Sequence, residues 1–436
     1  MQIVADLHLH SRFSRAVSSK MTIPTMATVA KIKGIDLLAT GDFTHPIWMK
    51  ELESQLEEVA EGIYAEKEST VKTHFVFGTE ISCIYTQGGK GRRVHTLVLV
   101  PSIEVAQTVN AKLSQRGCNL SSDGRPIIGL SLIELCALLF SIDENILVIP
   151  AHIWTPWFGV LGSSSGFDSL RESCGIYADK IYALETGLSS DPAMNWKVSE
   201  LDRYSLVSFS DAHSPEKLGR ELTVFASKKN VFTLSYKNLS LALQRKGEWQ
   251  IDYTIEFYPE EGKYHIDGHR LCGVCQTPEK TRKKGRQCHV CGKTLTLGVE
   301  GRVDQLANGK EVELGKETNQ EGVVFYKNAA HPPYVKLVPL QEVIAESIGK
   351  GVKTKAVATL YDTLIANFGS ELAVLMKAKQ EDLHKLNGKV AEAVLRVRSG
   401  NIFVQPGFDG VFGVVKIWGS EGRSEEKSKE QMSLFD

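Results

Sequence analysis

Two histidines near the start of the chain have the spacing of metal ligands. They lie in residues 5–10, ADLHLH. Side chains alternate faces along a strand, so Leu7 and Leu9 can pack into a core while His8 and His10 project together from the opposite face. Such a pair indicates a metal site at a strand end, although two incidental polar residues on a half-exposed strand would give the same pattern.

Ionisable side chains also close most of the later apolar segments. They are Asp42 after residues 37–41, Glu80 after 75–79, His95 at the end of 92–95, His152 after 148–151, Glu185 after 182–184, and the pair Asp211 and His213 in 210–213. Each residue alone could belong to a loop or be a buried structural histidine. Their recurrence favours one shared site, because in α/β barrels the chemistry collects at the carboxyl ends of strands.

The residue types predict the chemistry of that site. Nitrogen and carboxylate ligands without thiolate suit zinc, manganese or iron, and so many ligands predict more than one ion. Adjacent ions are a recurring solution for phosphoester hydrolysis, since they activate a water and neutralise charge on the attacking and leaving oxygens. Phosphoester hydrolysis is therefore the expected reaction class.

The elements that must position these side chains follow an α/β pattern. Residues 1–235 alternate short apolar strand segments with helical stretches. Strands are expected over 3–10, 36–40, 74–77, 94–100, 146–150, 180–184 and 206–209. A length of 436 residues predicts about two or three domains, and 42% hydrophobic residues are enough for a sizeable core.

These motifs resemble those of the PHP (polymerase and histidinol phosphatase) superfamily. The resemblance rests on residues 6–11, 79–80, 94–95, 151–152 and 210–213, which follow the family's order over roughly the first half of the chain. It implies a distorted (β/α)7 barrel with metal ions at the strand ends. Carried across, His8, His10, Glu80 and Asp211 would hold one ion, and Glu80 would bridge to a second ion held by His95 and His152.

The third metal position departs from the superfamily's pattern. The usual second motif ends in Asp-His, whereas here Phe43 follows Asp42. A third ion would need Asp42 and His213, with His45 as a substitute ligand. The expected cofactors are therefore two or three divalent ions, zinc, manganese or magnesium, and either Asp42 or Glu185 would orient the attacking water.

A second metal site is predicted in a separate module at 250–325. Cys272 and Cys275 form one CxxC pair, and Cys288 and Cys291 form another after 12 intervening residues. This is the spacing of a zinc ribbon. Four thiolates leave no open coordination position, so this zinc is expected to fold the module and take no part in catalysis.

The densest basic cluster of the chain lies between the two cysteine pairs. Residues 280–286 contain Arg282, Lys283, Lys284 and Arg286. The cluster could be a solvated loop tip. On a zinc-ribbon finger it is also a good contact for a phosphate backbone, because dense cations release counterions from DNA.

Residues 330–418 are expected to form a mainly helical DNA-binding domain. Apolar residues recur at helical spacing over 339–349 and 354–378. Residues 383–391 resemble half of a helix-hairpin-helix, in which Gly388 and Lys389 would offer backbone N–H groups to phosphate. An ordinary helical hairpin fits the same residues.

The chain ends in a polar stretch, 419–436, that is expected to be a disordered tether. Its last residues include Gln431, Leu434 and Phe435. This segment resembles the bacterial motif that binds the sliding clamp, in which the glutamine anchors by hydrogen bonds and the two apolar side chains fill a pocket. A slightly apolar C-terminus without a partner would look the same.

A narrower resemblance covers nearly the whole length. Residues 40–42, 150–157 and 185–191, followed by the cysteine module, the helical region and the tail, are similar to the endonuclease Q family. The resemblance implies a DNA repair enzyme that nicks double- or single-stranded DNA on the 5′ side of deaminated bases (uracil, hypoxanthine, xanthine) and at abasic sites. Such an enzyme would flip the damaged base into a pocket, for which the candidate walls are Trp154, Trp157, Gly187 and Ser189.

Two alternatives belong to other function classes. One is a PHP phosphomonoesterase acting on a small metabolite, and the other is a non-catalytic, clamp-associated DNA-binding protein. The net charge of -1, from 51 basic and 52 acidic residues, argues neither for nor against binding of nucleic acid. Any DNA-binding surface must be local. Without a membrane-length apolar run or an N-terminal signal pattern, the expected location is the cytoplasm and no membrane partner is expected.

Overall fold

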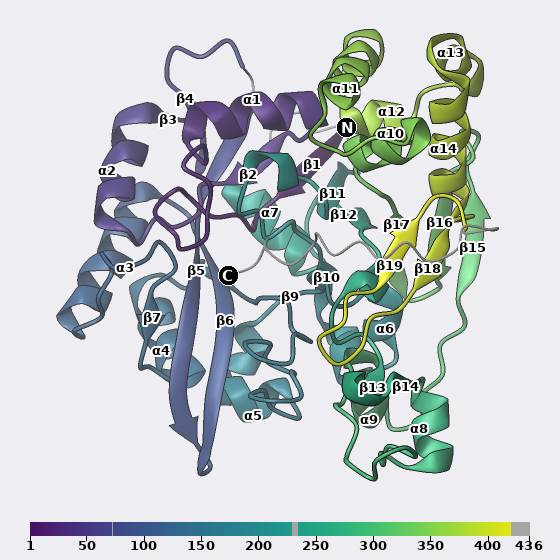
Figure 1. Ribbon diagram of the computed structural model, residues 1–436. Coiled ribbons are helices and arrows are strands. Elements are labelled where there is room, and N and C mark those ends of the chain that lie inside the picture. Colours follow the sequence, from purple (N-terminus) through teal and green to yellow (C-terminus); the bar gives the residue numbers. More distant parts are fainter. Residues whose placement is uncertain (72, 229–233, 420–436) are drawn as a thin grey trace.

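The computed structural model describes residues 1–71, 73–228 and 234–419 (Figure 1). The predicted clamp-binding residues Gln431, Leu434 and Phe435, and the tether after Gly419, lie outside the described residues. Within the described part of the chain, no helix combines the length and the apolar character that a bilayer crossing requires.

Seven of the strands in the described residues form the wall of the barrel. They are β1 (Gln2–Asp6), β2 (Leu37–Ala39), β5 (His74–Gln87), β6 (Lys90–Val100), β8 (Leu147–Pro150), β9 (Ala183–Glu185) and β10 (Ser205–Val207). Each predicted strand segment overlaps one of them, although β5 and β6 are much longer than the segments predicted over 74–77 and 94–100. β1, β2 and β5 are parallel, whereas β6 runs antiparallel to both β5 and β8. The barrel closes where Leu9, beyond β1, bridges to Ala212, beyond β10. The expected distorted (β/α)7 barrel is confirmed.

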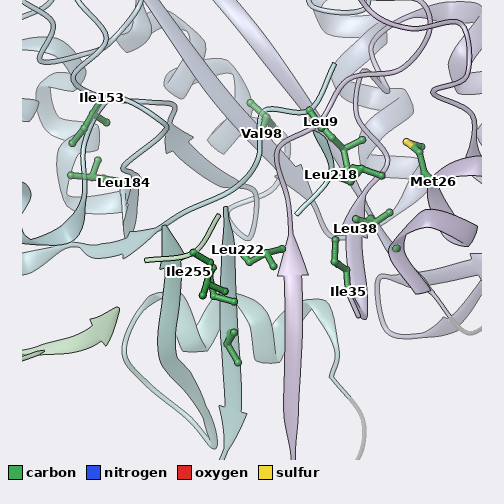
Figure 2. Close-up of a cluster of buried hydrophobic side chains, with 14 of the residues drawn as sticks. Leu9, Met26, Ile35, Leu38, Val98, Ile153, Leu184, Leu218, Leu222 and Ile255 are labelled. Atoms are coloured by element: carbon green, nitrogen blue, oxygen red, sulfur yellow. The ribbon is translucent and has the colours of Figure 1, made fainter. Parts of the chain in front are cut away.

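Two hydrophobic clusters lie on the two sides of the barrel wall. One contains Ala5 and Leu7 together with Leu239 and Leu243 of α7 (Tyr236–Leu243). The other contains Leu9, Leu38 and Val98 and extends to Met26 of α1 (Ile23–Lys33) (Figure 2). The remaining barrel helices are α2 (Pro46–Gln55), α3 (Ile103–Gln115), α4 (Leu132–Ile142), α5 (Leu170–Cys174) and α6 (Pro192–Trp196). Burial of apolar side chains on both faces of the wall fixes the strand ends that carry the polar residues.

The sheet continues past the barrel in both directions. β11 (Leu222–Ser227) pairs with β1, and β12 (Trp249–Glu256), β17 (His331–Lys336), β16 (Val324–Asn328) and β15 (Gly315–Thr318) follow in order. At the other edge lie β4 (Ile63–Glu66) and β3 (Leu56–Ala60). The predicted boundaries near 250 and 330 therefore cut through one sheet, because β12 and β17 continue it beyond the barrel.

The cysteine module, which is expected to bind zinc, and the helical region follow. The module contains β13 (Asp267–His269), β14 (Val274–Gln276), α8 (Pro278–Lys284) and α9 (Val299–Ala307). The expected helical region contains α10 (Leu340–Ile348), α11 (Lys355–Phe368), α12 (Glu371–Met376), α13 (Gln380–Leu386) and α14 (Gly388–Ser399). The long helix expected over 354–378 breaks at Gly369, whose φ is 90°. A last hairpin, β18 (Phe403–Gln405) and β19 (Val414–Lys416), extends towards β13 and β14 (Figure 1).

Candidate metal centre

The segment with the two leading histidines is held just beyond the end of β1. The Asp6 carboxylate accepts backbone N–H groups from Ser210 and Gly219, both at 2.9 Å. These contacts tie the start of the chain to the loop that carries Asp211. His8 and His10 thereby lie in the floor of the barrel opening, where both are buried.

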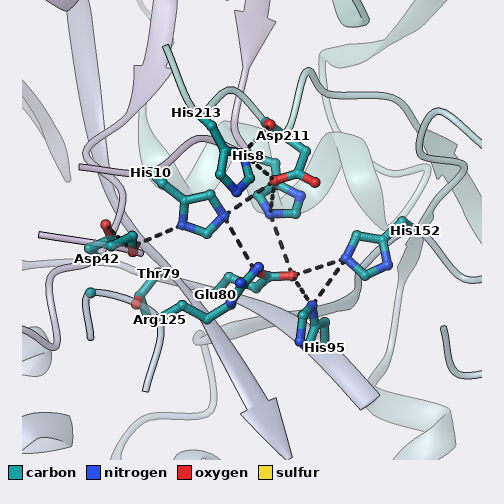
Figure 3. A network of polar contacts seen from close by, with 12 residues as sticks. His8, His10, Asp42, Thr79, Glu80, His95, Arg125, His152, Asp211 and His213 are labelled. Atoms are coloured by element: carbon teal, nitrogen blue, oxygen red, sulfur yellow. Dashed lines mark hydrogen bonds and ion pairs between the residues drawn. The ribbon is translucent and has the colours of Figure 1, made fainter. Parts of the chain in front are cut away.

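One group of ligand atoms consists of His8, His10 and Asp211 (Figure 3). Oδ1 of Asp211 lies 3.5 Å from Nε2 of His8 and 3.2 Å from Nε2 of His10. The three atoms lie within 4.8 Å of one another. This spacing lets a single cation contact all three.

A second group consists of Glu80, His95 and His152. Oε1 of Glu80 lies 2.8 Å from Nδ1 of His95 and 3.1 Å from Nε2 of His152. The same carboxylate also faces the first group, with Oε1 at 3.6 Å from His8 and Oε2 at 3.4 Å from His10. The structure thus brings together all six residues expected at the first two positions, with Glu80 between them, as predicted (Figure 3).

The donor atoms of the first group are the kind that a metal ion would bind. Nε2 of His8, Nε2 of His10 and Oδ1 of Asp211 are buried and have no hydrogen-bond partner. Buried polar atoms are rarely left unpaired in native proteins, and here three of them converge on one point. Imidazole nitrogen with carboxylate oxygen suits a divalent transition metal, so the residues fit such an ion.

Asp42 and Glu185 hold the histidines and do not line the space between the ligand atoms. Nδ1 of His8 lies 2.9 Å from Glu185, and Nδ1 of His10 lies 3.1 Å from Asp42. A carboxylate at Nδ1 fixes the ring so that Nε2 points to the metal position. The expectation that Asp42 or Glu185 would orient the attacking water stays a prediction, and in this structure both carboxylates contact histidine rings.

The third metal position is not built as expected. The second carboxylate oxygen of Asp42 accepts hydrogen bonds from Ser11 N at 2.6 Å, Ser11 Oγ at 2.7 Å and Ser14 Oγ at 2.8 Å. Neither Asp42 nor His213 belongs to either group of ligand atoms found among the described residues. Phe43, which replaces the usual histidine, is buried in the core.

His45 is also not a substitute ligand. Its Nδ1 caps α2 by accepting the backbone N–H of Trp48 at 3.4 Å, and its ring stacks on Phe13 at 4.5 Å between centroids. Burial lowers the pKa of His45 below its ordinary value. His213 packs against His10, with ring centroids 4.7 Å apart.

Arg125 is a member of the centre that the sequence patterns missed. Its guanidinium lies 3.0 Å from Oε2 of Glu80, and about a quarter of its side chain (25%) is exposed. It follows Gly124, which has no room for a side chain because a Cβ there would collide with Asp42 and Ser14. Arg125 lies in a loop, where functional residues do not recur at a regular sequence spacing. Only the tight Asp-Gly-Arg turn could have identified it from the sequence.

The centre as a whole has an excess of negative charge, which favours the binding of a cation. Its carboxylates are Asp42, Glu80, Glu185 and Asp211, whereas Arg125 is its fixed cation. Burial alone would oppose protonation of His8, yet Glu185, Asp211 and Glu80 together raise its pKa well above the ordinary value. Burial would likewise raise the pKa of Glu80, but His95, Arg125 and His8 hold it well below its usual range. An excess of carboxylate is the electrostatic setting that a bound cation balances.

Backbone strain is concentrated at the same place. Asp42, His152, Phe158 and Asp211 all have positive φ, at 49°, 30°, 74° and 47°. Left-handed backbone is unfavourable for residues other than glycine, and strain of this kind gathers at functional sites. The surrounding contacts therefore hold these four residues in an unfavourable backbone conformation.

The cysteine module differs from the expected four-cysteine site. Sγ of Cys272, Cys288 and Cys291 lies with a ring nitrogen of His269 in one group. Nδ1 of His269 is 3.6 Å from Sγ of Cys291. Cys275 is exposed and outside this group, since its position in β14, paired with Gly268, directs it elsewhere. The structure therefore favours His269 in the place expected for Cys275.

The predicted base-pocket residues separate into two kinds. Trp154 is fully buried and donates its Nε1–H to Asn195 at 2.8 Å, so it cannot form a pocket wall. Trp157 is 41% exposed. Gly187 packs directly against the backbone and Cβ of His152, and Ser189 lies 3.3 Å from the Thr155 hydroxyl. Only Trp157 among the four presents a large exposed surface.

The predicted DNA-contacting residues also differ in availability. Lys283 and Lys284 are exposed on α8, whereas Arg282 is paired with Asp304 and Arg286 donates to the Leu295 carbonyl. Residues 280–284 of the basic cluster are therefore helical, and Arg286 follows the end of α8.

One of the two backbone groups expected to bind phosphate in the helix-hairpin-helix interpretation, the Lys389 N–H, is engaged within the protein. The side chain of Asn387 caps α14 by accepting N–H groups from Lys389 and Val390. Of the two N–H groups expected to face phosphate, the cap engages that of Lys389 and not that of Gly388.

Comparison with known proteins gives matches along almost the whole chain. Residues 339–401 match a family model described as the MJ0043 C-terminal domain. The uncharacterized protein YqxK of Bacillus subtilis is 31% identical over 95% of this chain and 99% of its own length. The uncharacterized protein MJ0043 of Methanocaldococcus jannaschii is 33% identical over 61% of this chain, but the match spans 31% of that longer protein.

Two solved structures match at similar identity. The lesion-specific endonuclease PfuEndoQ from Pyrococcus furiosus has a TM-score of 0.80 and 31% identity, covering 95% of each chain. Endonuclease Q in complex with a 27-mer duplex that carries an abasic lesion has a TM-score of 0.79 and 31% identity, covering 95% and 96%. Because sequence and fold agree over nearly the full length, the chain belongs to the endonuclease Q family of DNA-cleaving hydrolases.

Proposed function

We propose that this protein is a metal-dependent repair endonuclease that nicks DNA on the 5′ side of deaminated bases, namely uracil, hypoxanthine and xanthine, and at abasic sites. One observation carries the proposal. Unpartnered, buried atoms of His8, His10 and Asp211 converge beside the Glu80 carboxylate, in a chain 31% identical to a lesion-specific endonuclease.

The six ligand residues would hold two divalent ions. His8, His10, Glu80 and Asp211 would bind one, and Glu80, His95 and His152 the other, with zinc, manganese or magnesium as candidates. When bound, the ions supply an acidified water and neutralise charge on phosphate oxygens. Since the ligand set of a third ion is not assembled, two ions fit these residues better than three.

The protein's own groups prepare the site for a phosphodiester. Glu185 and Asp42 fix the two leading imidazoles, so little reorganisation is needed when a charged substrate arrives. Arg125 donates to Glu80 and has further N–H groups on its partly exposed side. A guanidinium in this position can donate to a non-bridging phosphate oxygen and so stabilise the charge that develops in the transition state.

The test uses matched duplexes that carry uracil, hypoxanthine, xanthine, an abasic site or no lesion, with Mg²⁺, Mn²⁺ or Zn²⁺. Cleavage confined to the lesion strands is expected. His8→Ala and Asp211→Asn should abolish it while the melting temperature of the protein stays near that of the wild type, and His384→Ala, an exposed histidine on α13, is the matched control. Uniform cutting of all duplexes, or near wild-type activity in the two variants, would refute the proposal.

The same duplexes separate the alternatives. Turnover of a chromogenic phosphomonoester without DNA cleavage would point to a metabolite phosphatase. Metal content without hydrolysis of any nucleic acid would point to a non-catalytic DNA-binding protein.

We further propose a sliding clamp as a partner, on the basis of Gln431, Leu434 and Phe435 in the sequence. Deletion of residues 431–436 should abolish capture on immobilised bacterial clamp and leave cleavage of a short duplex unchanged. Undiminished capture by the truncated protein would refute the interaction.

A further inference from the structure

The loop that carries Asp211 is held by an arginine that lies outside the two groups of ligand atoms. Nε of Arg220 donates to the carbonyl of Ser210 at 2.8 Å, and its Nη2 donates to the carbonyl of Asp211 at 3.3 Å. The planar guanidinium therefore binds two consecutive carbonyls with donors at a fixed spacing. Asp211 needs such support, because its φ of 47° is unfavourable for a residue other than glycine.

The backbone of Asp211 sets the position of its carboxylate. Oδ1 faces Nε2 of His8 at 3.5 Å and Nε2 of His10 at 3.2 Å. The short aspartate side chain keeps both distances only while its own peptide keeps its orientation. Loss of the Arg220 contacts would let the strained peptide relax and would move Oδ1 away from the two histidines.

The segment that bears Arg220 is tied to the same loop a second time. It follows the 3-10 turn Pro215–Lys217, and the N–H of Gly219 donates to the Asp6 carboxylate at 2.9 Å. The other oxygen of Asp6 accepts the N–H of Ser210 at 2.9 Å. Asp6 therefore holds the N–H of Ser210, while Arg220 holds its carbonyl.

A buried lysine connects this segment to the C-terminal helices. Lys33, at the end of α1, donates from Nζ to the Glu216 carbonyl at 3.1 Å and lies 3.5 Å from Oε2 of Glu371 on α12. The two side chains are only 11% and 8% exposed. Removal of one partner from a buried ion pair leaves the other charge uncompensated. The position of segment 216–220 therefore depends on the position of α12.

Glu371 also joins the first three helices of that region. Its Oε1 accepts the N–H of Leu340 at the start of α10 at 2.9 Å, and its Oε2 accepts the hydroxyl of Tyr361 on α11 at 2.7 Å. α1 and α12 lie against each other (Figure 1), and a Cβ at Gly34 would lie 2.7 Å from Oγ of Ser370. One carboxylate thus links α10, α11 and α12 to the barrel.

Two further contacts bring these helices to the segment itself. Arg220 lines a small cavity together with Leu372 and Leu375 of α12, and its volume of about 10 Å³ is enough for one water at most. Lys217 lies 3.5 Å from Glu342 of α10. Closely packed interfaces of this kind transmit a displacement from one side to the other.

We infer that Arg220 is a positioning residue for Asp211, and that the helices α10–α12 set the metal affinity of the centre through Lys33 and segment 216–220. This inference rests on the proposed function, in which Asp211 binds a divalent ion. A shift of α12 against α1 would change the position of the Asp211 carboxylate. Metal binding in the barrel and the position of the helices are then coupled in both directions.

The first test measures Mn²⁺ binding to the full chain by electron paramagnetic resonance, so it does not depend on cleavage. Arg220→Ala should weaken the binding of one Mn²⁺ ion by about 10–100-fold, as the loss of an outer contact does at other metal sites. Arg220→Lys keeps the charge but not the planar fork, so it should recover only part of the affinity.

Arg245→Ala is the matched control for this measurement. Arg245 also donates to backbone carbonyls, those of Asp202 and Tyr204, but these precede β10, whereas the metal centre lies beyond the other end of that strand. Its loss should leave the Mn²⁺ affinity unchanged.

The second test addresses the helices. Glu371→Gln keeps hydrogen-bonding groups for Leu340 and Tyr361 but removes the charge that faces Lys33, so it should weaken Mn²⁺ binding by about 2–30-fold. The double variant with Arg220→Ala should bind Mn²⁺ no more weakly than Arg220→Ala alone, because both changes act through one segment. Glu392→Gln, which removes an exposed ion pair with Arg396 on α14, is the control.

Unchanged Mn²⁺ affinity in Arg220→Ala or Glu371→Gln, with a lower melting temperature, would make the contacts merely structural and overturn the inference. Additive losses in the double variant would overturn it as well. If circular dichroism shows that Arg220→Ala is unfolded, Arg220→Lys decides, and wild-type affinity in that variant counts against the inference. A wild-type protein that binds Mn²⁺ but cleaves no duplex would refute the endonuclease alone, since the affinities of the variants still decide the role of Arg220.

Discussion

Glu185 accepts a hydrogen bond from Nδ1 of His8 at 2.9 Å, although the two residues are 177 positions apart in the chain. Asp42 holds Nδ1 of His10 in the same way at 3.1 Å. Each carboxylate fixes one imidazole with Nε2 facing the shared Asp211 oxygen. The centre therefore depends on residues that would not touch a metal ion themselves.

Removal of Glu185 should weaken metal binding without unfolding the barrel. Glu185→Ala frees the His8 ring to rotate, so metal affinity and cleavage should each fall by about 10–100-fold. Titration of bound metal against cleavage rate measures both, and excess metal should restore part of the activity. Glu313→Ala, an exposed carboxylate, is the control. Unchanged metal affinity in Glu185→Ala would show that the hydrogen bond does not position His8.

Arg125 should act on the rate of cleavage more than on DNA binding. Arg125→Ala removes a donor near the phosphate position, and loss of one such donor costs about 100-fold or more in kcat. Arg125→Lys keeps the charge but not the planar fork, so it should recover only part of the rate. Single-turnover kinetics with a uracil duplex distinguishes kcat from binding, and a pure KM effect would contradict this role.

The cysteine module offers a direct test of which four residues would bind zinc. His269→Ala and Cys288→Ser should each release zinc and lower the melting temperature, because structural zinc contributes folding free energy. Cys275→Ser should retain one equivalent of zinc and the wild-type melting temperature. Metal analysis by mass spectrometry decides between them, and zinc loss from Cys275→Ser would restore the four-cysteine interpretation.

Most of the ligand residues were accessible to sequence reasoning because spacing carries their signal. His8 and His10 share a face by alternation, and His152 follows the apolar strand β8. The expectation that every ligand closes a strand is wrong for Glu80 and His95, which lie within the long strands β5 and β6. The antiparallel pairing of these strands, with Ser82 opposite His95, brings the two ligands together.

The residues that sequence reasoning misplaced depend on tertiary neighbours. Asp42 occupies a ligand position in the motif, yet Ser11 and Ser14 saturate one of its oxygens. Trp154 and Trp157 are three positions apart, and only the packing of the loop decides that one is buried and the other exposed. His269 lies outside any CxxC pair, so its place beside three cysteines follows from the turn between β13 and β14.

Glu256 and Glu221 form a buried carboxyl pair below the centre that should make stability depend on pH. Both are buried, and Glu256 accepts Ser208 Oγ at 2.5 Å as well as the Thr254 hydroxyl. Burial raises the pKa of Glu256 to about 7, and burial with the Glu256 charge raises the pKa of Glu221. The folded state therefore holds a proton that the unfolded chain releases near its ordinary pKa of 4.5.

A raised carboxyl pKa contributes stability below the unfolded pKa, and that contribution is lost as the pH rises through the folded pKa. Between about pH 5 and pH 8 the wild type should lose on the order of 1–3 kcal/mol of unfolding free energy from this pair. Glu256→Gln keeps an acceptor for Ser208 and carries no titratable proton. It should therefore flatten the pH profile and be more stable than the wild type at pH 8.

Urea denaturation at pH 5, 6.5 and 8 measures this difference, with Glu313→Gln as the exposed control. Parallel profiles for wild type and Glu256→Gln would show that the pair does not share a proton in the folded protein.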